Sequence, residues 1–174
     1  MNLKEQTAEK HKEAESHPFI KSIFDNTVDK NDYTDYLFQL ANVYYVLEDV
    51  VGEKFNLFDG MEEIKRAKAI TADFNELADP AHAYVIREST MNYLNYLLGI
   101  EDQQDAMAHV YVRHMGDLFG GQMLAKLVPG SATMYKFDNI KKLVTEIRSK
   151  INDNMGHEAN IAFDHNIAMI KEYS

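Results

Sequence analysis

The chain has 174 residues, and apolar side chains make up 45% of it, which suits one compact domain over residues 1–174 and argues against disorder. Its formal net charge of −10, with no long basic block, argues against a nucleic-acid partner, because the chain would repel the phosphate backbone. Cysteine is absent, which excludes disulfides, thiolate zinc sites and a cysteine nucleophile.

No apolar run approaches the roughly 18 residues needed to span a bilayer. The first residues, MNLKEQTAEKHKE, are polar and acidic, unlike a signal or transit peptide. We therefore expect a soluble cytoplasmic protein that does not bind membranes.

The apolar spacing predicts an all-α fold of about eight helices and no sheet, since only three prolines and eight glycines interrupt the chain. The first predicted helix places Leu3, Thr7, His11 and Ala14 on one face, and a short second helix begins at Pro18. The third has Asp32 as its expected N-cap and carries a long stripe: Tyr33, Tyr36, Leu37, Leu40, Tyr44, Leu47, Val51 and Phe55.

The remaining stripes predict five further helices, over about 64–77, 81–98, 101–128, 140–151 and 157–170. The Asp79-Pro80 step separates the first two of these, and Gly99 ends the second. Asp138 is the expected N-cap of the helix over 140–151.

Three glycines interrupt the predicted helix over 101–128, at Gly116, Gly120 and Gly121. Each costs roughly 1 kcal/mol relative to alanine inside a helix. They indicate either close packing at a bend or a kink that brings backbone against a flat ligand, where a Cβ would collide.

His11 lies on the apolar face of the first predicted helix, with Glu15 one turn later. It is either a hydrogen-bonded core histidine or a metal ligand whose second ring nitrogen is held by the carboxylate. The other histidines form no ligand-spaced cluster, and HExxH is absent.

Two segments resemble the heme oxygenases, in particular the soluble, ferredoxin-dependent type. Residues 7–15, TAEKHKEAE, resemble the proximal helix whose histidine binds heme iron, and residues 111–122, YVRHMGDLFGGQ, resemble the distal pattern YxRYLGDLSGGQ. Residues 44–48 and 158–166 fit more loosely, so the resemblance spans nearly the whole chain. The chain departs from the pattern at His114, where tyrosine is common, and at Phe119, where serine is usual.

The resemblance implies a monomer that holds heme b between the first helix and a glycine-kinked distal helix. Heme would be both cofactor and substrate, cleaved by O2 and reduced ferredoxin to biliverdin (the IXα isomer), Fe2+ and CO. His11 would bind the iron, the N–H of Gly116 would donate to bound oxygen, and Asp117 would deliver protons through ordered water. The resemblance also assigns heme contacts to Lys4, Thr7, Glu15, Tyr111, Arg113, Gly120, Gly121, Arg148 and Phe163, and places Tyr44, Phe119 and Asn166 along the pocket.

Basic residues around 141–150 are either a solvated face or a docking patch for an acidic ferredoxin. With cations of the two heme-bearing helices, the predicted patch comprises Lys10, Lys12, Arg113, Lys141, Lys142, Arg148 and Lys150.

Two alternatives stay open. One is a non-catalytic heme-binding or storage protein on the same fold, which would not need the Gly116-Asp117 pair. The other is a helical interaction domain without a cofactor, which leaves the three glycines unexplained.

Overall fold

The structure, a computed structural model, describes residues 1–173, and these form helices and turns without a strand. Over these residues twelve α-helices follow the chain: α1 (Leu3–Gln6), α2 (Ala8–Glu15), α3 (Pro18–Phe24), α4 (Lys30–Tyr45), α5 (Gly52–Phe55), α6 (Ala67–Leu77), α7 (Glu88–Leu98), α8 (Gln103–Val110), α9 (Gly116–Phe119), α10 (Gly121–Leu124), α11 (Ile140–Lys150) and α12 (Gly156–Ile170). Wider π-helical turns cover Val46–Val51 and Tyr111–Met115, and 3-10 turns cover Glu62–Ile64, Thr133–Tyr135, Asp153–Met155 and Lys171–Tyr173. The predicted all-α class is confirmed.

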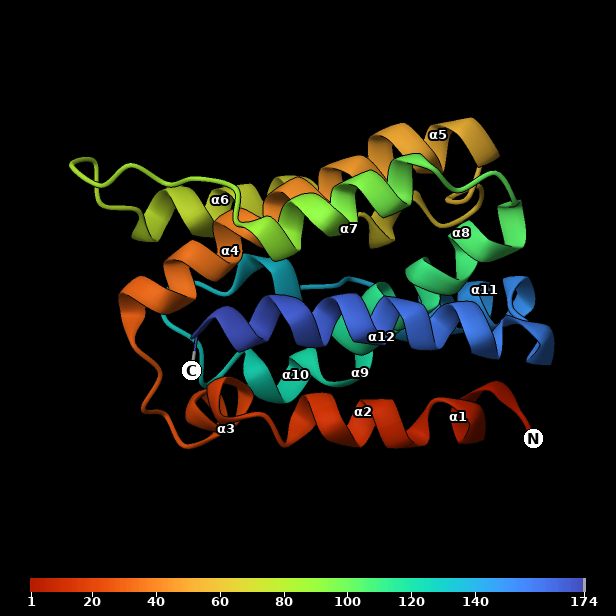
Figure 1. Cartoon of the computed structure of the whole chain (residues 1–174), viewed down its shortest axis with the longest axis horizontal. Helices are drawn as coiled ribbons and strands as arrows, with labels where there is room; N and C mark the ends of the chain where they lie inside the picture. Colours follow the sequence, from red (N-terminus) through yellow and green to blue (C-terminus); the bar gives the residue numbers. More distant parts are fainter. Residues whose placement is uncertain (174) are drawn as a thin grey trace.

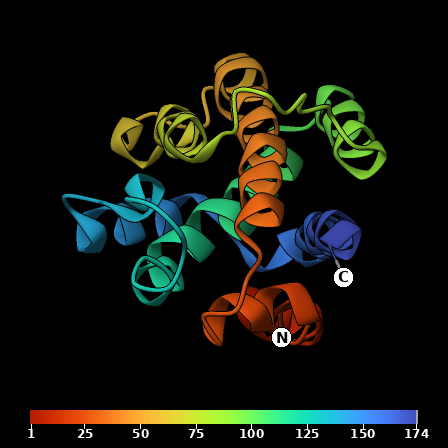
Figure 2. The same ribbon diagram turned by 90° about the vertical axis from the view of Figure 1, so that its left-hand side faces the viewer.

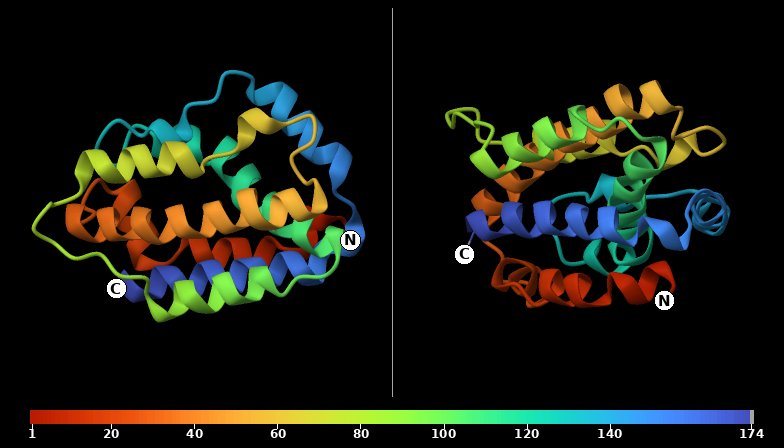
Figure 3. Two further views of the ribbon diagram at one scale, coloured as in Figure 1. Left: turned by 90° about the horizontal axis from the view of Figure 1, so that it is seen from above. Right: turned by 45° about the vertical axis from the view of Figure 1, so that its right-hand side comes forward.

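Helix α12 crosses the middle of the molecule, with α2 packed along one side of it and α7 along another (Figure 1). Seen from the end, α1–α3 form the base, and α9 and α10 lie above it on one side while α12 lies on the other (Figure 2). Helices α4 and α6 pack side by side on the far side of the molecule from α2 (Figures 1 and 3). Two segments therefore lie against α12: the proximal segment, which is helix α2, and the distal segment, which is Tyr111–Leu124.

Three of the eight predicted helical stretches are divided. The first breaks at Thr7, whose hydroxyl donates to the carbonyl of Leu3 at 3.0 Å and thus competes with the helical bonding. The other two change to π-helical turns, one between α4 and α5 and one between α8 and α9. Such widened turns are often found at functional sites.

Two predicted N-caps are wrong, one by three residues and one by a single residue. Helix α4 is capped by Asp29, which is extended and whose Oδ1 accepts from the N–H of Asp32 at 3.0 Å. Asp32 thus occupies the third helical position, where its charge still favours the helix N-terminus. Helix α11 begins after Asn139 rather than Asp138, and no side chain caps it.

Two predicted helix ends are also wrong. Helix α7 begins at Glu88 instead of residue 81, because Gln39 binds the preceding segment in a non-helical form: its side chain donates to the carbonyl of Val85 at 2.8 Å and accepts from the N–H of Arg87 at 2.9 Å. The distal helix stops at Leu124, and a turn covers the residues before Pro129, which disfavours helix just ahead of it.

Helix α12 is held along its second half and beyond its C-terminus. A cluster of Ala14, Phe163 and Ile167 joins it to α2, apart from the large core that the other helices share. Beyond its C-terminus, the Tyr173 hydroxyl donates to Oδ2 of Asp35 at 2.6 Å, and Nε of Arg87 donates to the same oxygen at 2.6 Å. Among residues 1–173 no helix is both long and apolar enough to cross a bilayer.

Candidate functional site

The imidazole of His11 lies on the exposed side of α2. Its side chain is 59% exposed, while Leu3, Thr7 and Ala14 on the same predicted stripe are buried. Nε2 lies 3.2 Å from Oε1 of Glu15, which confirms the expected contact and leaves the second ring nitrogen for another partner. The reading of His11 as a core histidine is therefore wrong.

The ring of His11 also meets the ring of Phe163 from α12, edge to face, with 5.8 Å between the centroids. Lys10 of α2 pairs with Asp164 of α12 at 2.8 Å. Helix α2 thus exposes His11, and α12 contacts both the His11 ring and Lys10.

Gly116 and Gly120 leave one face of the distal segment open. Both have ordinary right-handed helical backbone angles, so neither needs glycine for its conformation. A Cβ at Gly116 would meet no atom within 4 Å, and a Cβ at Gly120 would meet only the carbonyl oxygen of Gly116 at 3.2 Å. Packing inside the protein therefore does not explain these two glycines, whereas a flat ligand against this face would.

Gly121 has a different explanation, because a Cβ there would collide with the ring of Tyr135. Close packing thus accounts for this third glycine, although it was predicted to contact the heme. The N–H of Gly116 is also engaged within the helix, where it donates to the carbonyl of Arg113. What Gly116 offers a ligand in this structure is space rather than the predicted hydrogen bond.

Apolar side chains border the open glycine face. Phe119 is 56% exposed and Met123 is 62% exposed, and they lie three and seven residues after Gly116, on the same side of the segment. Exposed apolar side chains beside glycines form a surface that suits a broad apolar ligand.

Asp117 lies behind this face, inside the protein. It is 9% exposed, and its Oδ2 accepts a hydrogen bond of 2.6 Å from the hydroxyl of Tyr44 on α4. Burial raises the pKa of Asp117 to about 6, against the opposing influence of the nearby His114, Tyr44 and Arg113. Asp117 is therefore not a surface carboxylate, and its pKa suits proton exchange near neutral pH.

Arg113 is buried as well, which removes it from the predicted basic surface. Its Nη1 donates to Oδ1 of Asn166 on α12 at 2.8 Å, and its guanidinium lies 5.4 Å from the centre of the Tyr44 ring. The structure thus joins three predicted site residues, Arg113, Tyr44 and Asn166, around Asp117.

Lys4 lies exposed on α1, and α1 is tied to the segment that follows α11. Both the N–H of Leu3 and the side-chain amide of Gln6 donate to Asp153, at 3.2 and 2.7 Å. This contact ties α1, which carries Lys4, to the 3-10 turn that follows α11, the helix that carries Arg148.

Arg148 is exposed, and its guanidinium lies over the ring of Phe119 at 5.9 Å, next to the glycine face. Tyr111 is half-buried in the second π-helical turn. Thr7 is buried and its hydroxyl bonds within α1, so the structure shows it shaping the α1–α2 break.

Two of the predicted surface cations have carboxylate partners. Lys142 lies 3.6 Å from Glu63, and Lys10 is paired with Asp164 as described above. Lys12 and Lys141 are exposed, and Lys150 is half-buried.

Sequence reasoning missed a buried hydrogen-bonded pair behind the distal segment. Nε2 of His114 lies 2.8 Å from Oε2 of Glu48, and both side chains are almost completely buried. A signal existed, because Glu48 follows Tyr44 by one turn on a buried helix face, but the sequence does not indicate which residue it meets.

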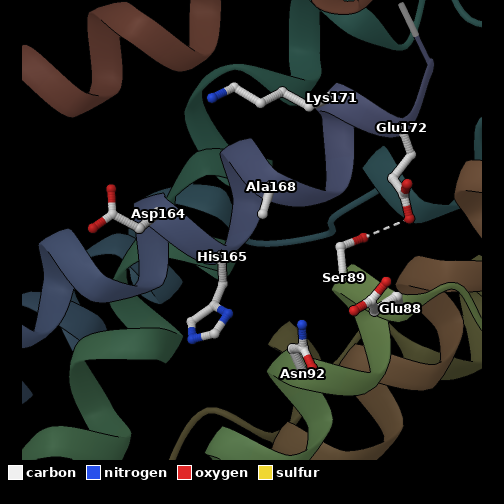
Figure 4. Close-up of a pocket in the computed structure, with 8 residues that line it drawn as sticks. All are labelled: Glu88, Ser89, Asn92, Asp164, His165, Ala168, Lys171 and Glu172. Carbon is white, nitrogen blue, oxygen red and sulfur yellow. Dashed lines mark hydrogen bonds between the residues drawn. The ribbon is translucent and has the colours of Figure 1, made fainter.

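A separate groove of about 460 Å³ lies between α7 and α12 (Figure 4). Figure 4 shows its polar lining, in which the hydroxyl of Ser89 donates to Glu172 and His165 faces Asn92. None of the predicted site residues lines this groove.

The comparisons with known proteins agree with this geometry. A family model for heme oxygenases matches residues 1–172. The chain belongs to the heme oxygenase family. The resemblance of the two motifs is thereby confirmed.

Named heme oxygenases align along nearly the entire chain. Heme oxygenase of Porphyra purpurea is 30% identical, over 98% of this chain and 84% of its own length, and that of Guillardia theta is 30% identical, over 99% and 84%. The solved heme oxygenase of Leptospira interrogans superposes with a TM-score of 0.85 at 25% identity, covering 98% of this chain and 97% of its own. Heme oxygenase-1 of the cyanobacterium Synechocystis, solved with heme, shares the fold at a TM-score of 0.85 and 24% identity.

The residues present fit heme, the group that the heme oxygenase family implies. The glycine face leaves a space that Cβ atoms at Gly116 and Gly120 would narrow, and exposed apolar side chains border this space. Within residues 1–173 no three His, Asp or Glu side chains are grouped to bind a metal ion by themselves. A metal at His11 would therefore need most of its ligands from the group that carries it, as heme iron has.

Proposed function

We propose that this heme oxygenase cleaves heme with O2 and with electrons from ferredoxin, and releases biliverdin, Fe2+ and CO. The observation that carries the proposal is the buried Asp117–Tyr44 pair directly behind an open glycine face. A storage protein needs the face but has no use for an acid with a pKa near 6 behind it.

On the proximal side, His11 would bind the iron and Glu15 would orient its ring. Lys4 and Arg148 would bind the two propionates by charge-assisted hydrogen bonds. Bound heme supplies both the iron at which O2 is activated and the carbon that is oxidised.

On the distal side, Gly116 and Gly120 would let the ring lie against the backbone, while Phe119 and Met123 exclude water from its edge. Asp117 would hold a proton and release it toward the reacting oxygen through solvent, and Tyr44 would keep its carboxyl in place.

The test adds hemin to the purified protein and records the Soret band, then supplies ferredoxin reductase, ferredoxin and NADPH. Heme oxygenase activity predicts a Soret band followed by biliverdin and CO. A Soret band without biliverdin would indicate a storage protein, and no Soret band would contradict heme binding altogether.

We also propose that the first turn of α11 orients the ferredoxin through Lys141 and Lys142, two exposed cations on a chain of net charge −10, of which Lys142 also lies 3.6 Å from Glu63. Changing both residues to glutamate should raise the KM for ferredoxin several-fold and leave heme affinity unchanged. The double variant Lys21→Glu/Lys68→Glu, on α3 and α6, is the matched charge control.

The salt dependence tests the same proposal. Salt weakens the close attraction and relieves the distant repulsion between two acidic proteins, so turnover should pass through a maximum at modest ionic strength. An unchanged KM in the Lys141/Lys142 variant would locate the docking face elsewhere.

A further inference from the structure

Each of the two π-helical turns contributes one side chain to the buried pair missed by sequence reasoning. Glu48 lies in the turn after Tyr44, and His114 lies in the turn before Asp117. Their contact, 2.8 Å between Oε2 and Nε2, therefore joins the two segments that carry the distal acid and its hydrogen-bond donor.

Only one polar contact holds the His114 ring among the described residues. The ring lies between those of Tyr44 and Phe58, at centroid distances of 5.1 and 5.2 Å. Nδ1 of His114 is buried and has no hydrogen-bond partner among residues 1–173. The orientation of the imidazole thus depends on Glu48.

Glu48 is in turn held by two backbone N–H groups. Its two oxygens accept from the N–H groups of Arg66 and Ala67, at 2.6 and 3.0 Å, at the N-terminus of α6. Hydrogen bonds to a carboxylate and a helix N-terminus both favour the negative charge. A carboxylate next to an imidazole favours the protonated ring, while burial favours the neutral ring.

We propose that Glu48 and His114 are positioning residues for Asp117: Glu48 holds the His114 ring as a cation behind the distal segment, beside the Asp117–Tyr44 contact. The electrostatics support this, because a charged His114 opposes the effect of burial on the pKa of Asp117. The other groups facing Asp117 are the guanidinium groups of Arg113 and Arg66, which are always charged, and four phenols whose pKa burial raises: Tyr33, Tyr36, Tyr44 and Tyr135. His114 is thus the facing cation that can lose its proton.

The proposal rests on the proposed function only for its effect on heme cleavage, so its test uses the heme-free protein. NMR titration of aspartate carboxyl carbons, with Asp117→Asn assigning the signal, follows the protonation of Asp117 directly. The wild-type midpoint is expected near pH 6. His114→Gln should raise it by about one pH unit, because a nearby positive charge is lost. Glu48→Gln should move it in the same direction, because the imidazole loses its counter-ion.

The chain contains a matched control, since His109 and Glu158 form a second buried pair, with Nε2 and Oε1 3.1 Å apart. His109→Gln should destabilise the fold without moving the Asp117 midpoint. An unchanged midpoint in folded His114→Gln would overturn the proposal and reduce the pair to a structural role.

A measurement on the unmutated chain covers the case in which these variants do not fold. The ring-nitrogen chemical shifts of His114 at pH 7 distinguish imidazolium from neutral imidazole. The proposal requires imidazolium, and a neutral ring would overturn it.

Discussion

The proximal and distal segments are held in very different ways. Helix α2 buries only Ala14 and keeps His11 in solvent, joined to the rest by a small apolar cluster and one exposed ion pair. The distal segment runs through the core, and Asp117, Arg113 and His114 are all buried there with polar partners.

The difference separates two tasks. A metal ligand needs access and one orienting partner, which an exposed helix provides. A proton-donating carboxyl needs a controlled dielectric and a fixed geometry, which only the core provides. We therefore expect variants on the proximal side to act through binding and variants on the distal side to act through turnover.

The largest effect is expected from His11→Ala, which removes the proposed iron ligand. Heme affinity should fall at least about tenfold, with loss of the spectrum of a histidine-bound heme and of all turnover. Hemin titration measures this, and His157→Ala, an exposed histidine of α12, is the control. A wild-type spectrum in His11→Ala would move the ligand elsewhere.

Asp117→Ala should separate binding from turnover. We expect an unchanged Soret band and a roughly 100-fold loss of biliverdin formation, since a general acid contributes at least that much. Asp59→Ala, an exposed aspartate, should behave as wild type. Normal biliverdin yield from Asp117→Ala would show that the buried carboxyl takes no part in the reaction.

Amide hydrogen exchange should show the unequal support directly. In the heme-free protein α2 should exchange faster than α8 and α9, because few apolar contacts hold it. Heme should slow exchange in α2 by tenfold or more, since binding stabilises the segment that supplies the ligand. Equal protection of both segments before heme addition would contradict the comparison.

The smallest effect is expected on stability, from Asp117→Asn. The pKa of Asp117 is about 6 in the folded protein against 3.8 for a free aspartate, so the folded state binds the proton more tightly. The stability that proton binding by Asp117 contributes is then lost as pH rises from about 4 to about 6, and it stays lost above pH 6. Asp117→Asn should raise the free energy of unfolding by about 3 kcal/mol at pH 7.5 and by little at pH 4. Urea unfolding at both pH values measures it, and an equal gain at both would assign the change to packing.

Much of the fold followed from local pattern. Apolar spacing located all eight helical stretches, and the glycine-rich motif contains Asp117, which is buried against Tyr44. The helix over 81–98 was extended too far because the segment before Glu88 is bound by Gln39, far away in sequence. Local propensity does not report such tertiary contacts.

Sequence reasoning could name candidate site residues one at a time, but it could not show which distant residues contact each other. Gly116 and Gly121 are alike in sequence, yet only the position of Tyr135 makes one open and the other packed. Glu48 and His114 are separated by 66 positions, and their pairing depends on how α4 and the distal segment cross.

Helix α12 serves as a spacer between the two sides of the site. Phe163 contacts the His11 ring, and Asn166, three residues later, binds Arg113. Since a helix rises about 1.5 Å per residue and turns about 100°, a single turn sets the separation of the proximal and distal walls. Tyr173 and Asp35 anchor the end of this helix. One residue inserted before 163 would therefore rotate both contacts together. A residue inserted between 163 and 166 would instead change the separation of the two walls.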